Sequence, residues 1–280
     1  MSALILNADD FGRHEEINNA VAIACENGCL RSATLMPGGT AFEHAVTVAK
    51  NHPSLGVGIH LTLVNGNPVL TTAEIPSLVD SSGHFWDNHS IFVKRFFTGK
   101  INLEEVQREL AAQIRKAQNT GLVFTHIDSH QHMHTLPGIN TTALTLAKKA
   151  GLNAVRISQA PLKSGSNSGG LGQFIGRLGL NVLARLTRLK ANSMHMKSPE
   201  HFAGIVAGEA VTPKHLQSII RTLPKGTTEV MLHPGTNNAL LQDFCQWEHD
   251  FEAELAAVTS QETINLLQEN NIQLKNFADL

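Results

Sequence analysis

Several residue types that would narrow the interpretation are scarce in this chain of 280 residues. It has no tyrosine and only three cysteines, and this small odd number argues against a disulfide framework and favours buried, reduced thiols. Neither sign of charge is in excess, since the net charge is −2 and the isoelectric point is near 6.7. This balance gives no electrostatic reason to expect binding to nucleic acid or to a strongly acidic substrate.

Long apolar runs are also missing. No apolar stretch approaches the roughly 18 residues that a membrane-spanning helix needs. The opening residues, MSALILNADDFG, have no basic segment ahead of their short apolar run, so we expect no secretory signal. Hydrophobic residues make up 42% of the chain and charged residues 16%, which is typical of a soluble protein with a sizeable core. We therefore expect a cytoplasmic protein.

Strand-like and helix-like patterns alternate along most of the chain. We expect strands at 3–7, 32–36, 55–63, 122–128, 154–157 and 228–233. Helical patterns cover 15–28, 41–51, 103–118, 136–150, 175–189 and 213–223, with further helices towards the C-terminus. This alternation predicts a parallel sheet, either open or closed into a barrel. No internal repeat or interdomain linker stands out, so we expect one α/β domain over residues 1–280.

Two segments break the alternation. Residues 65–99 are rich in Pro, Gly, Ser and Asp and contain Phe85 and Trp86, and an insertion of this length predicts a lid. The variable segment 159–192 begins with a flexible Gly- and Ser-rich loop and continues with apolar residues at helical spacing, interspersed with Arg and Lys. Two interpretations stay open for it: a helix with a solvated basic edge, or a surface that approaches a lipid headgroup or an amphiphilic substrate.

Residues 125–134, THIDSHQHMH, contain four of the fifteen histidines. On a helix, His126 and His130 would stand one turn apart and could hold a metal between them. On a strand, His126, Asp128 and His130 would share one face, because side chains alternate with a period of two. The cluster ends an apolar strand, so we expect His130 to face a site that other strand ends share.

Four strand ends carry Asp or His. Asp9 and Asp10 end the first strand, and His60 ends the third. His130 follows a later strand, and His233 follows the last one in the stretch MLHPG. Ligands of parallel α/β folds bind at the carboxyl ends of the strands. Four separate segments that deliver Asp and His to one edge predict a shared site more strongly than any single motif.

One carboxylate and two imidazoles form an open site for a divalent metal, which lowers the pKa of water toward about 7. Asp10, His60 and His130 supply such a set. The side chains of Asp9 and Asp10 diverge on a strand, so one can bind metal while the other accepts a proton from water. A protonated histidine could donate a proton to the leaving group. A metal, a base and an acid together suit hydrolysis of an amide or ester. The simpler alternatives are a helix N-cap at the paired aspartates and a buried structural role for His60.

The stretches NADDFG, GIHLTL, THIDSHQHMH and HPG, in this order, resemble the YdjC-like carbohydrate deacetylases over nearly the whole chain. SATLMPGG, VNGNPVL, IPSLVDSSGHF and LKNFADL are similar to the hopanoid-biosynthesis branch of that family. The resemblance implies a distorted (β/α) TIM-like barrel that removes an acetyl group from an N-acetylated amino sugar. It also implies one divalent metal ion, Mg or Zn, on Asp10, His60 and His130. The family's catalytic base corresponds to Asp9, and its histidine suited to general acid catalysis corresponds to His233.

We therefore hypothesise a metal-dependent deacetylase of an N-acetylglucosamine-type sugar, carried by a hopanoid lipid intermediate. Asp128 would orient a catalytic or ligating histidine. Arg156, at the end of its strand, would bind sugar hydroxyls or form a plain salt bridge. Phe85 and Trp86 would contact the substrate from the insertion.

Three other functions compete with this hypothesis. The nearest is a deacetylase of soluble chitooligosaccharides. A carbohydrate-binding protein that uses the metal without turnover is less favoured, because binding needs one carboxylate whereas hydrolysis benefits from two. A metal-dependent phosphoesterase would bring two metals and a basic clamp for phosphate, and the sequence shows neither. No nucleic-acid partner is expected, while peripheral membrane contact and a homo-oligomer both stay open.

Overall fold

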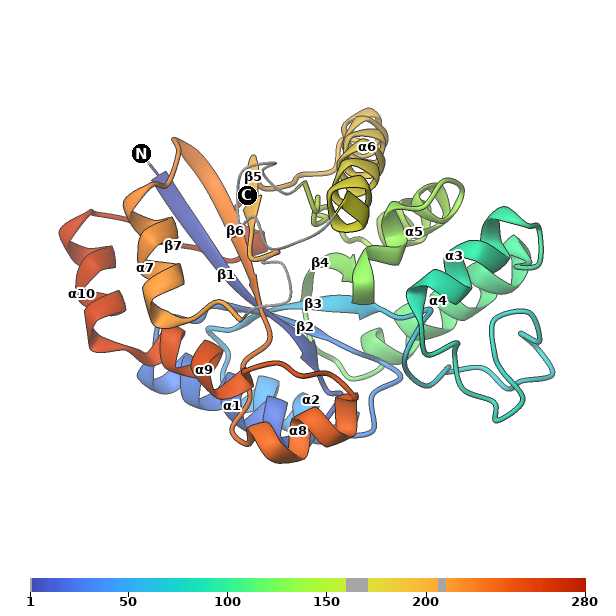
Figure 1. The fold of residues 1–280 in the computed structure, drawn as a ribbon, viewed down its shortest axis with the longest axis horizontal. Helices are drawn as coiled ribbons and strands as arrows, with labels where there is room; N and C mark the ends of the chain where they lie inside the picture. The colour runs from blue at the N-terminus through green and yellow to red at the C-terminus, as the bar shows by residue number, and fades with distance from the viewer. Residues whose placement is uncertain (1, 160–170, 206–209) are drawn as a thin grey trace.

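Parallel strands form a curled half-barrel at the centre of the protein (Figure 1). The computed structural model describes residues 2–159, 171–205 and 210–280. Within these residues the sheet has seven strands: β1 (Ser2–Phe11), β2 (Ser32–Leu35), β3 (Gly56–Leu61), β4 (Phe124–Ser129), β5 (His201–Ala203), β6 (Gly226–Leu232) and β7 (Gln273–Leu274). Their order is β4-β3-β2-β1-β6-β5, and β7 pairs with the first residues of β1.

Every strand pair in this sheet is parallel, so the strands present their carboxyl ends at the same edge. The register places Asn7 of β1 beside Ser32 of β2 and Met231 of β6. On a neighbouring pair, His60 of β3 lies beside Asp128 of β4. The residues that end β1, β3, β4 and β6 therefore meet at one edge of the half-barrel.

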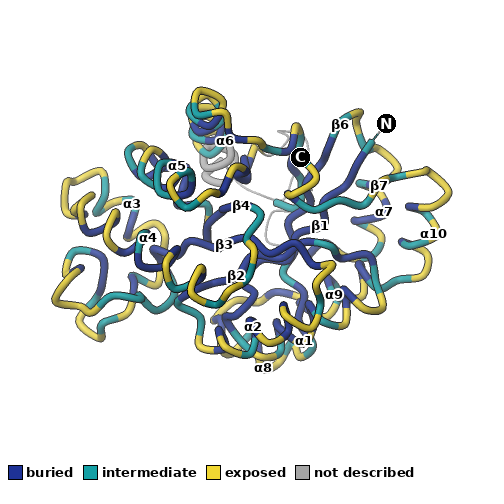
Figure 2. Tube along the Cα trace, turned by 180° about the vertical axis from the view of Figure 1, so that it is seen from behind, coloured by how far each residue is buried: buried dark blue, intermediate teal, exposed yellow. Residues whose placement is uncertain are grey.

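Helices cover the outside of the sheet in two groups (Figure 1). The first group consists of α1 (Glu15–Asn27), α2 (Phe42–Asn51), α7 (Pro213–Arg221), α8 (Asn238–Cys245), α9 (Phe251–Thr259) and α10 (Gln261–Glu269). The second consists of α3 (His89–Phe97), α4 (Leu103–Gln118), α5 (Ile139–Lys149) and α6 (Leu171–Ser193). Short 3₁₀ turns, η1 (His130–Thr135) and η2 (Phe277–Asp279), follow β4 and β7. Figure 2 shows the buried residues along the strands and the exposed ones on the outer turns of the helices.

Helix α4 illustrates how the sequence sets these elements. The side chain of Asn102 caps the helix by accepting a hydrogen bond from the backbone N–H of Glu104 at 2.9 Å. Val106, Leu110 and Ile114 recur every fourth residue and are all buried in the core. The apolar face therefore attaches the helix to the sheet, and the capping residue fixes where it begins.

Most of the predicted elements are present, and three differences stand out. The expected strand at 154–157 is reduced to isolated parallel bridges at Ala154 and Val155. The strands β5 and β7 were not predicted, because two or three residues are too short to show a period of two. The α/β class and single domain are supported. The TIM-like barrel is not confirmed, because the described strands form an open half-barrel.

The predicted insertion, residues 65–99, contains α3 and an irregular loop that is anchored on α4. Both carboxylate oxygens of Glu109 accept hydrogen bonds, one from the backbone N–H of Val69 and one from that of Leu70, at 2.8 and 2.9 Å. Its function as a lid stays a prediction. In the variable segment, α6 supplies the predicted helix, while the Gly- and Ser-rich loop at 160–170 lies outside the described residues.

None of the helices in the described ranges is both long and apolar enough to cross a membrane.

Candidate active site

The end of β1 brings two carboxylates to the edge of the sheet with different backbone conformations. Pairing with β2 becomes irregular between Ala8 and Phe11, as at a β-bulge. Asp10 has a φ of 59°, in the left-handed region that Asp tolerates better than most residues. Gly12 follows with a φ of 97°, a value that favours glycine. This local break lets Asp9 and Asp10 face different partners.

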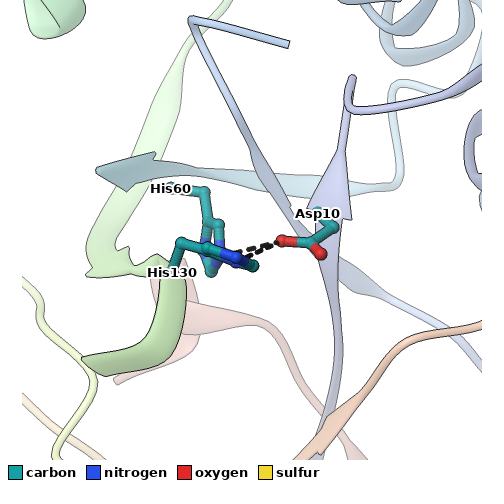
Figure 3. A group of neighbouring side chains, drawn as sticks. All are labelled: Asp10, His60 and His130. Atoms are coloured by element: carbon teal, nitrogen blue, oxygen red, sulfur yellow. Dashed lines mark ion pairs between the residues drawn. The ribbon is translucent and has the colours of Figure 1, made fainter. Parts of the chain in front are cut away.

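Asp10, His60 and His130 form a buried cluster at this edge (Figure 3). Asp10 Oδ1 lies 2.8 Å from His130 Nδ1 and 3.3 Å from His60 Nε2. One ligand atom from each residue lies within 4.8 Å of the other two. Asp10 Oδ1 and His60 Nε2 are buried and have no hydrogen-bond partner among the described residues. A carboxylate and two imidazoles gathered in this way fit a divalent cation, so the residues present suit the predicted metal.

The other ring nitrogen of His60 is held by Asp128. His60 Nδ1 lies 2.7 Å from Asp128 Oδ1, which leaves Nε2 directed at Asp10. Burial lowers the pKa of His60, but the carboxylates of Asp128 and Asp10 beside its ring raise it overall to about 10. The same carboxylates would favour any cation at this position. The structure thus brings Asp128 to a histidine of the cluster, where an orienting residue was predicted.

Asp10 is paired with a positive charge on its other oxygen. Arg13 Nη1 donates to Asp10 Oδ2 at 2.8 Å, and Arg13 Nη2 donates to the side chain of Asn65. Burial raises the pKa of Asp10, but His130 and Arg13 together hold it well below its usual range. Asp10 is therefore ionised, with Oδ2 bound by Arg13 and Oδ1 open toward the two histidines.

Arg156 connects the second aspartate to the cluster. Its side chain is fully buried, and Nη1 and Nη2 donate to the two oxygens of Asp9 at 2.6 Å each. Nη1 also lies 2.7 Å from Asp128 Oδ2, and Nε donates to Glu229 at 2.7 Å. Burial raises the pKa of Glu229 to about 7, although Arg156 opposes this shift. One guanidinium therefore joins three carboxylates and, through Asp128, links Asp9 to His60.

His233 directly follows β6 and lines the same pocket as Asp9. Its backbone N–H donates to the carboxylate of Glu254 on α9. Its ring meets the rings of Trp247 and His249 edge-on, with centroids 5.2 and 5.6 Å apart. Burial lowers the pKa of His233, and the negative charges of Asp9 and Glu254 oppose this shift only in part. The strand end, Glu254 and two rings thus fix the position of His233.

A pocket of about 780 Å³ opens at this edge of the sheet. Its polar side includes Asp9, Arg13, Asn65, His130 and His233. Its apolar wall includes Val93 and Phe97 of α3, Leu180 and Leu183 of α6, Met133, Leu136 and Trp247. The pocket therefore joins a polar end, which adjoins the histidine cluster, to an apolar wall.

Three residues predicted to bind substrate do not line this pocket within the described part of the chain. The guanidinium of Arg156 faces carboxylates, which matches the salt-bridge alternative for this residue. Phe85 is fully buried in the core, and the half-buried ring of Trp86 is covered by Arg95 at 4.3 Å. The tryptophan at the pocket is Trp247, in the loop between α8 and α9, where no periodic pattern marks it.

Sequence reasoning also missed Arg13 and Glu254. Arg13 follows Asp10 by three residues, and that short spacing was a usable signal for an ion pair. Glu254 lies among several acidic residues around α9, and nothing in the sequence distinguishes the one that reaches the backbone of His233.

The chain is similar over almost its whole length to a known family and to named relatives. The family described as YdjC-like protein matches residues 3–269. A carbohydrate deacetylase of Brevibacillus brevis is 31% identical over 283 residues, covering 99% of each chain. One from Geobacillus stearothermophilus is 31% identical and covers 98% of this chain and 96% of its own.

A solved structure from Enterococcus faecalis V583, described as a candidate cellobiose-phosphate cleavage protein, superposes with a TM-score of 0.75. It is 27% identical and covers 99% of this chain and 98% of its own. The match to the family extends over almost the whole chain, from the first strand to α10. The chain belongs to the YdjC-like protein family.

Proposed function

We propose that this protein is a metal-dependent carbohydrate deacetylase that hydrolyses the acetamide of an N-acetylglucosamine-type sugar. The observation that carries the proposal is the cluster of Asp10, His60 and His130. Its atoms Asp10 Oδ1 and His60 Nε2 are buried without a hydrogen-bond partner in the described part of the chain. Two relatives that align over almost their whole length carry the name carbohydrate deacetylase, which supports the same reaction here.

Asp10, His60 and His130 would hold one divalent cation, magnesium or zinc. When bound, such a cation polarises a carbonyl oxygen and lowers the pKa of water toward about 7. Asp128 holds Nδ1 of His60, and Arg13 holds Oδ2 of Asp10. These partners orient two of the three side chains before any cation binds.

Asp9 acts as the catalytic base and takes a proton from the attacking water. Arg156 donates to both oxygens of Asp9, and Asn7 donates to Oδ1 at 3.0 Å, so the carboxylate is held in one orientation. Because Arg156 also contacts Asp128, which holds His60, the position of the base is tied to the cluster.

His233 acts as the general acid. As the amide C–N bond breaks, the sugar nitrogen takes a proton from His233 and the water oxygen stays on the released acetate. Burial lowers the pKa of His233, which makes its protonated form a stronger donor. Glu254 holds the backbone of His233, so the ring keeps its place at the pocket as the proton leaves.

We infer that the sugar is carried by a lipid of the hopanoid type. The apolar wall that α3 and α6 give the pocket supports an apolar substrate portion, and four stretches of the sequence are similar to the hopanoid branch. A soluble chitooligosaccharide is the alternative substrate, and it would use the polar end of the pocket alone.

The test is acetate release by protein stripped of metal, before and after addition of Mg or Zn. Restored release from an N-acetylglucosaminyl hopanoid supports the proposal, whereas release from diacetylchitobiose alone supports the soluble substrate. Asp9→Asn should lower turnover about 10²- to 10⁴-fold and spare metal binding. Asp243→Asn, on the exposed side of α8, is the matched control and should change neither. Near-normal activity of Asp9→Asn would remove Asp9 as the base, and no acetate from either substrate would overturn the proposal.

A further inference from the structure

Two helices border the apolar wall of the pocket, and both carry exposed apolar side chains. Phe97 of α3 lines the pocket and is still 66% exposed. On α6, Leu180 and Leu183 line the pocket, while Val182 is 54% exposed. Ile91 of α3 is exposed as well. Apolar surface therefore continues from the pocket onto the outside of the protein.

The outer face of α6 is an apolar stripe without a partner in the described part of the chain. At about 100° per residue, Leu178, Val182, Leu186 and Leu189 fall on one side of the helix, and all four are exposed. The opposite side packs inward, since Ala184, Thr187 and Ala191 are fully buried. Figure 1 shows α6 at the upper edge of the molecule, beside α5.

The charges on these two helices are all of one sign. Together α3 and α6 contain six Lys and Arg residues and no Asp or Glu, in a chain whose net charge is −2. Lys94 and Arg185 are exposed, and Lys100 lies just after α3 and is exposed too. Positive charge is therefore concentrated where the exposed apolar side chains lie.

We propose that this rim, made of α3 and residues 178–190 of α6, docks on an anionic lipid bilayer, so that the pocket takes its substrate at the membrane surface. An apolar stripe with basic residues beside it is the pattern of a helix that lies in the bilayer interface. The rim would contact the apolar part of an amphiphilic substrate, while its acetylated sugar reaches Asp9 and His233. The proposal rests on the proposed function for the sugar, but the docking itself does not depend on it.

A second copy of the chain fits this rim less well. A symmetric dimer would place the same surface on both sides of the contact. Because the two helices carry only positive charge, Arg185 and Lys94 would then face like charges, whereas anionic headgroups would attract them.

The experiment is co-sedimentation of the full chain with vesicles of phosphatidylcholine, alone or mixed with about one quarter phosphatidylglycerol. We expect binding to the anionic vesicles that weakens at high salt. Val182→Asp should weaken it about tenfold, because the stripe loses apolar area and gains a repelled charge. Val123→Asp is the matched control. Val123 is 88% exposed and directly precedes β4, so it lies at the edge formed by the amino ends of the strands, opposite the edge that carries the pocket. This substitution should change vesicle binding by less than about twofold.

A second pair of variants isolates the charge. Arg185→Gln should weaken binding to anionic vesicles about fivefold, while Arg221→Gln, on the exposed last turn of α7, should not. Absence of vesicle binding, or equal losses for Val182→Asp and Val123→Asp, would overturn the proposal. A dimer in solution that Val182→Asp dissociates, without vesicle binding, would assign the stripe to a second copy and overturn it too.

The docking result is separable from the proposed chemistry. Val182 does not line the pocket, so Val182→Asp should release acetate from a soluble substrate at the rate of the unmodified protein. Vesicle binding without any acetate release would leave the docking surface intact and contradict only the proposed function.

Discussion

Two clusters in this protein contain the same ligand types, one carboxylate and two imidazoles, yet their surroundings differ. In the first cluster, Asp10 Oδ1 is buried without a hydrogen-bond partner in the residues that the structure describes. In the second, of His233, His249 and Glu254, both oxygens of Glu254 accept backbone N–H groups, from Val211 at 2.7 Å and from His233. Asp10 therefore keeps one oxygen, Oδ1, free to bind a cation, whereas both oxygens of Glu254 already hold backbone segments together.

The histidines of the two clusters differ in whether a neighbouring carboxylate orients the ring. His60 is oriented through Nδ1 by Asp128, so Nε2 is presented to the cluster. His249 stacks on Trp247, with ring centroids 4.0 Å apart. Its Nε2 lies 3.3 Å from a carboxylate oxygen of Glu254, but the two atoms do not form a hydrogen bond. The composition of a cluster therefore does not identify a metal site. A metal site is identified by a carboxylate oxygen that no hydrogen-bond donor already occupies and by a neighbouring residue that orients the imidazole.

The largest expected effect separates the two clusters by activity. His60→Ala removes a proposed ligand and should lower acetate release about 10³-fold or more. His249→Ala removes a ring that packs on His233, and we expect a loss of about tenfold through misplacement of the general acid. Steady-state kinetics on the same substrate measure both. Equal losses in the two variants would mean that the clusters share one function.

The next effect concerns the arginines beside the first cluster. Arg156→Met leaves Asp9, Asp128 and Glu229 buried without their shared cation, and we expect a loss of about 3–5 kcal/mol in the free energy of unfolding. Arg13→Met is the comparison variant: Arg13 is paired with Asp10 alone among carboxylates of the described chain, so its loss should be about 2 kcal/mol. Urea unfolding of both variants measures the two losses of free energy. A smaller loss for Arg156→Met than for Arg13→Met would contradict the claim that Arg156 stabilises three buried carboxylates.

The smallest effect is a pH dependence of stability that arises at Glu229. Its pKa of about 7 in the folded protein lies above the ordinary value of 4.5. Between these two pH values the folded state therefore holds a proton that the unfolded chain has released. This contribution is present below about pH 4.5 and is lost as the pH rises through 7. Glu229→Gln should therefore gain stability relative to the unmodified protein between pH 5 and pH 8, by on the order of 2 kcal/mol.

Melting temperatures recorded across that pH range measure the gain. Glu248→Gln, at an exposed position before α9, is the control and should follow the unmodified protein at every pH. If the curves for Glu229→Gln and the unmodified protein stayed parallel, Glu229 would not be the titrating carboxylate beside Arg156.

Much of the fold follows from local sequence patterns. The buried strand β1 and the apolar face of α4 could be predicted because an apolar run and a helical period are properties of short segments, although β1 continues to Phe11, beyond the expected range of 3–7. The strands β5 and β7 could not, because they form by pairing with β6 and β1 rather than from a pattern of their own. The barrel that the resemblance implied is not confirmed, since 154–157 forms only isolated bridges, to Ile127 of β4 and to Lys197.

Local sequence patterns also predict one part of the candidate site and miss another. Asp10, His60 and His130 could be predicted to meet, because each lies at or just after the carboxyl end of a parallel strand. The surroundings of Arg156 could not, because its three carboxylate partners come from β1, β4 and β6 and meet only in the folded protein. The sequence also does not tell which aromatic residues reach the pocket. Phe85 packs into the core of the second helix group, and Trp247 takes a place at the pocket from a loop.

The measurement that tests the central claim most directly is the number of metal ions bound per chain. Metal-free protein is dialysed against zinc or magnesium, and the bound metal is counted by elemental analysis. We expect one ion per chain in the unmodified protein and in His249→Ala, and none in His60→Ala. One ion retained by His60→Ala, or an ion lost from His249→Ala, would contradict the assignment of the metal to Asp10, His60 and His130.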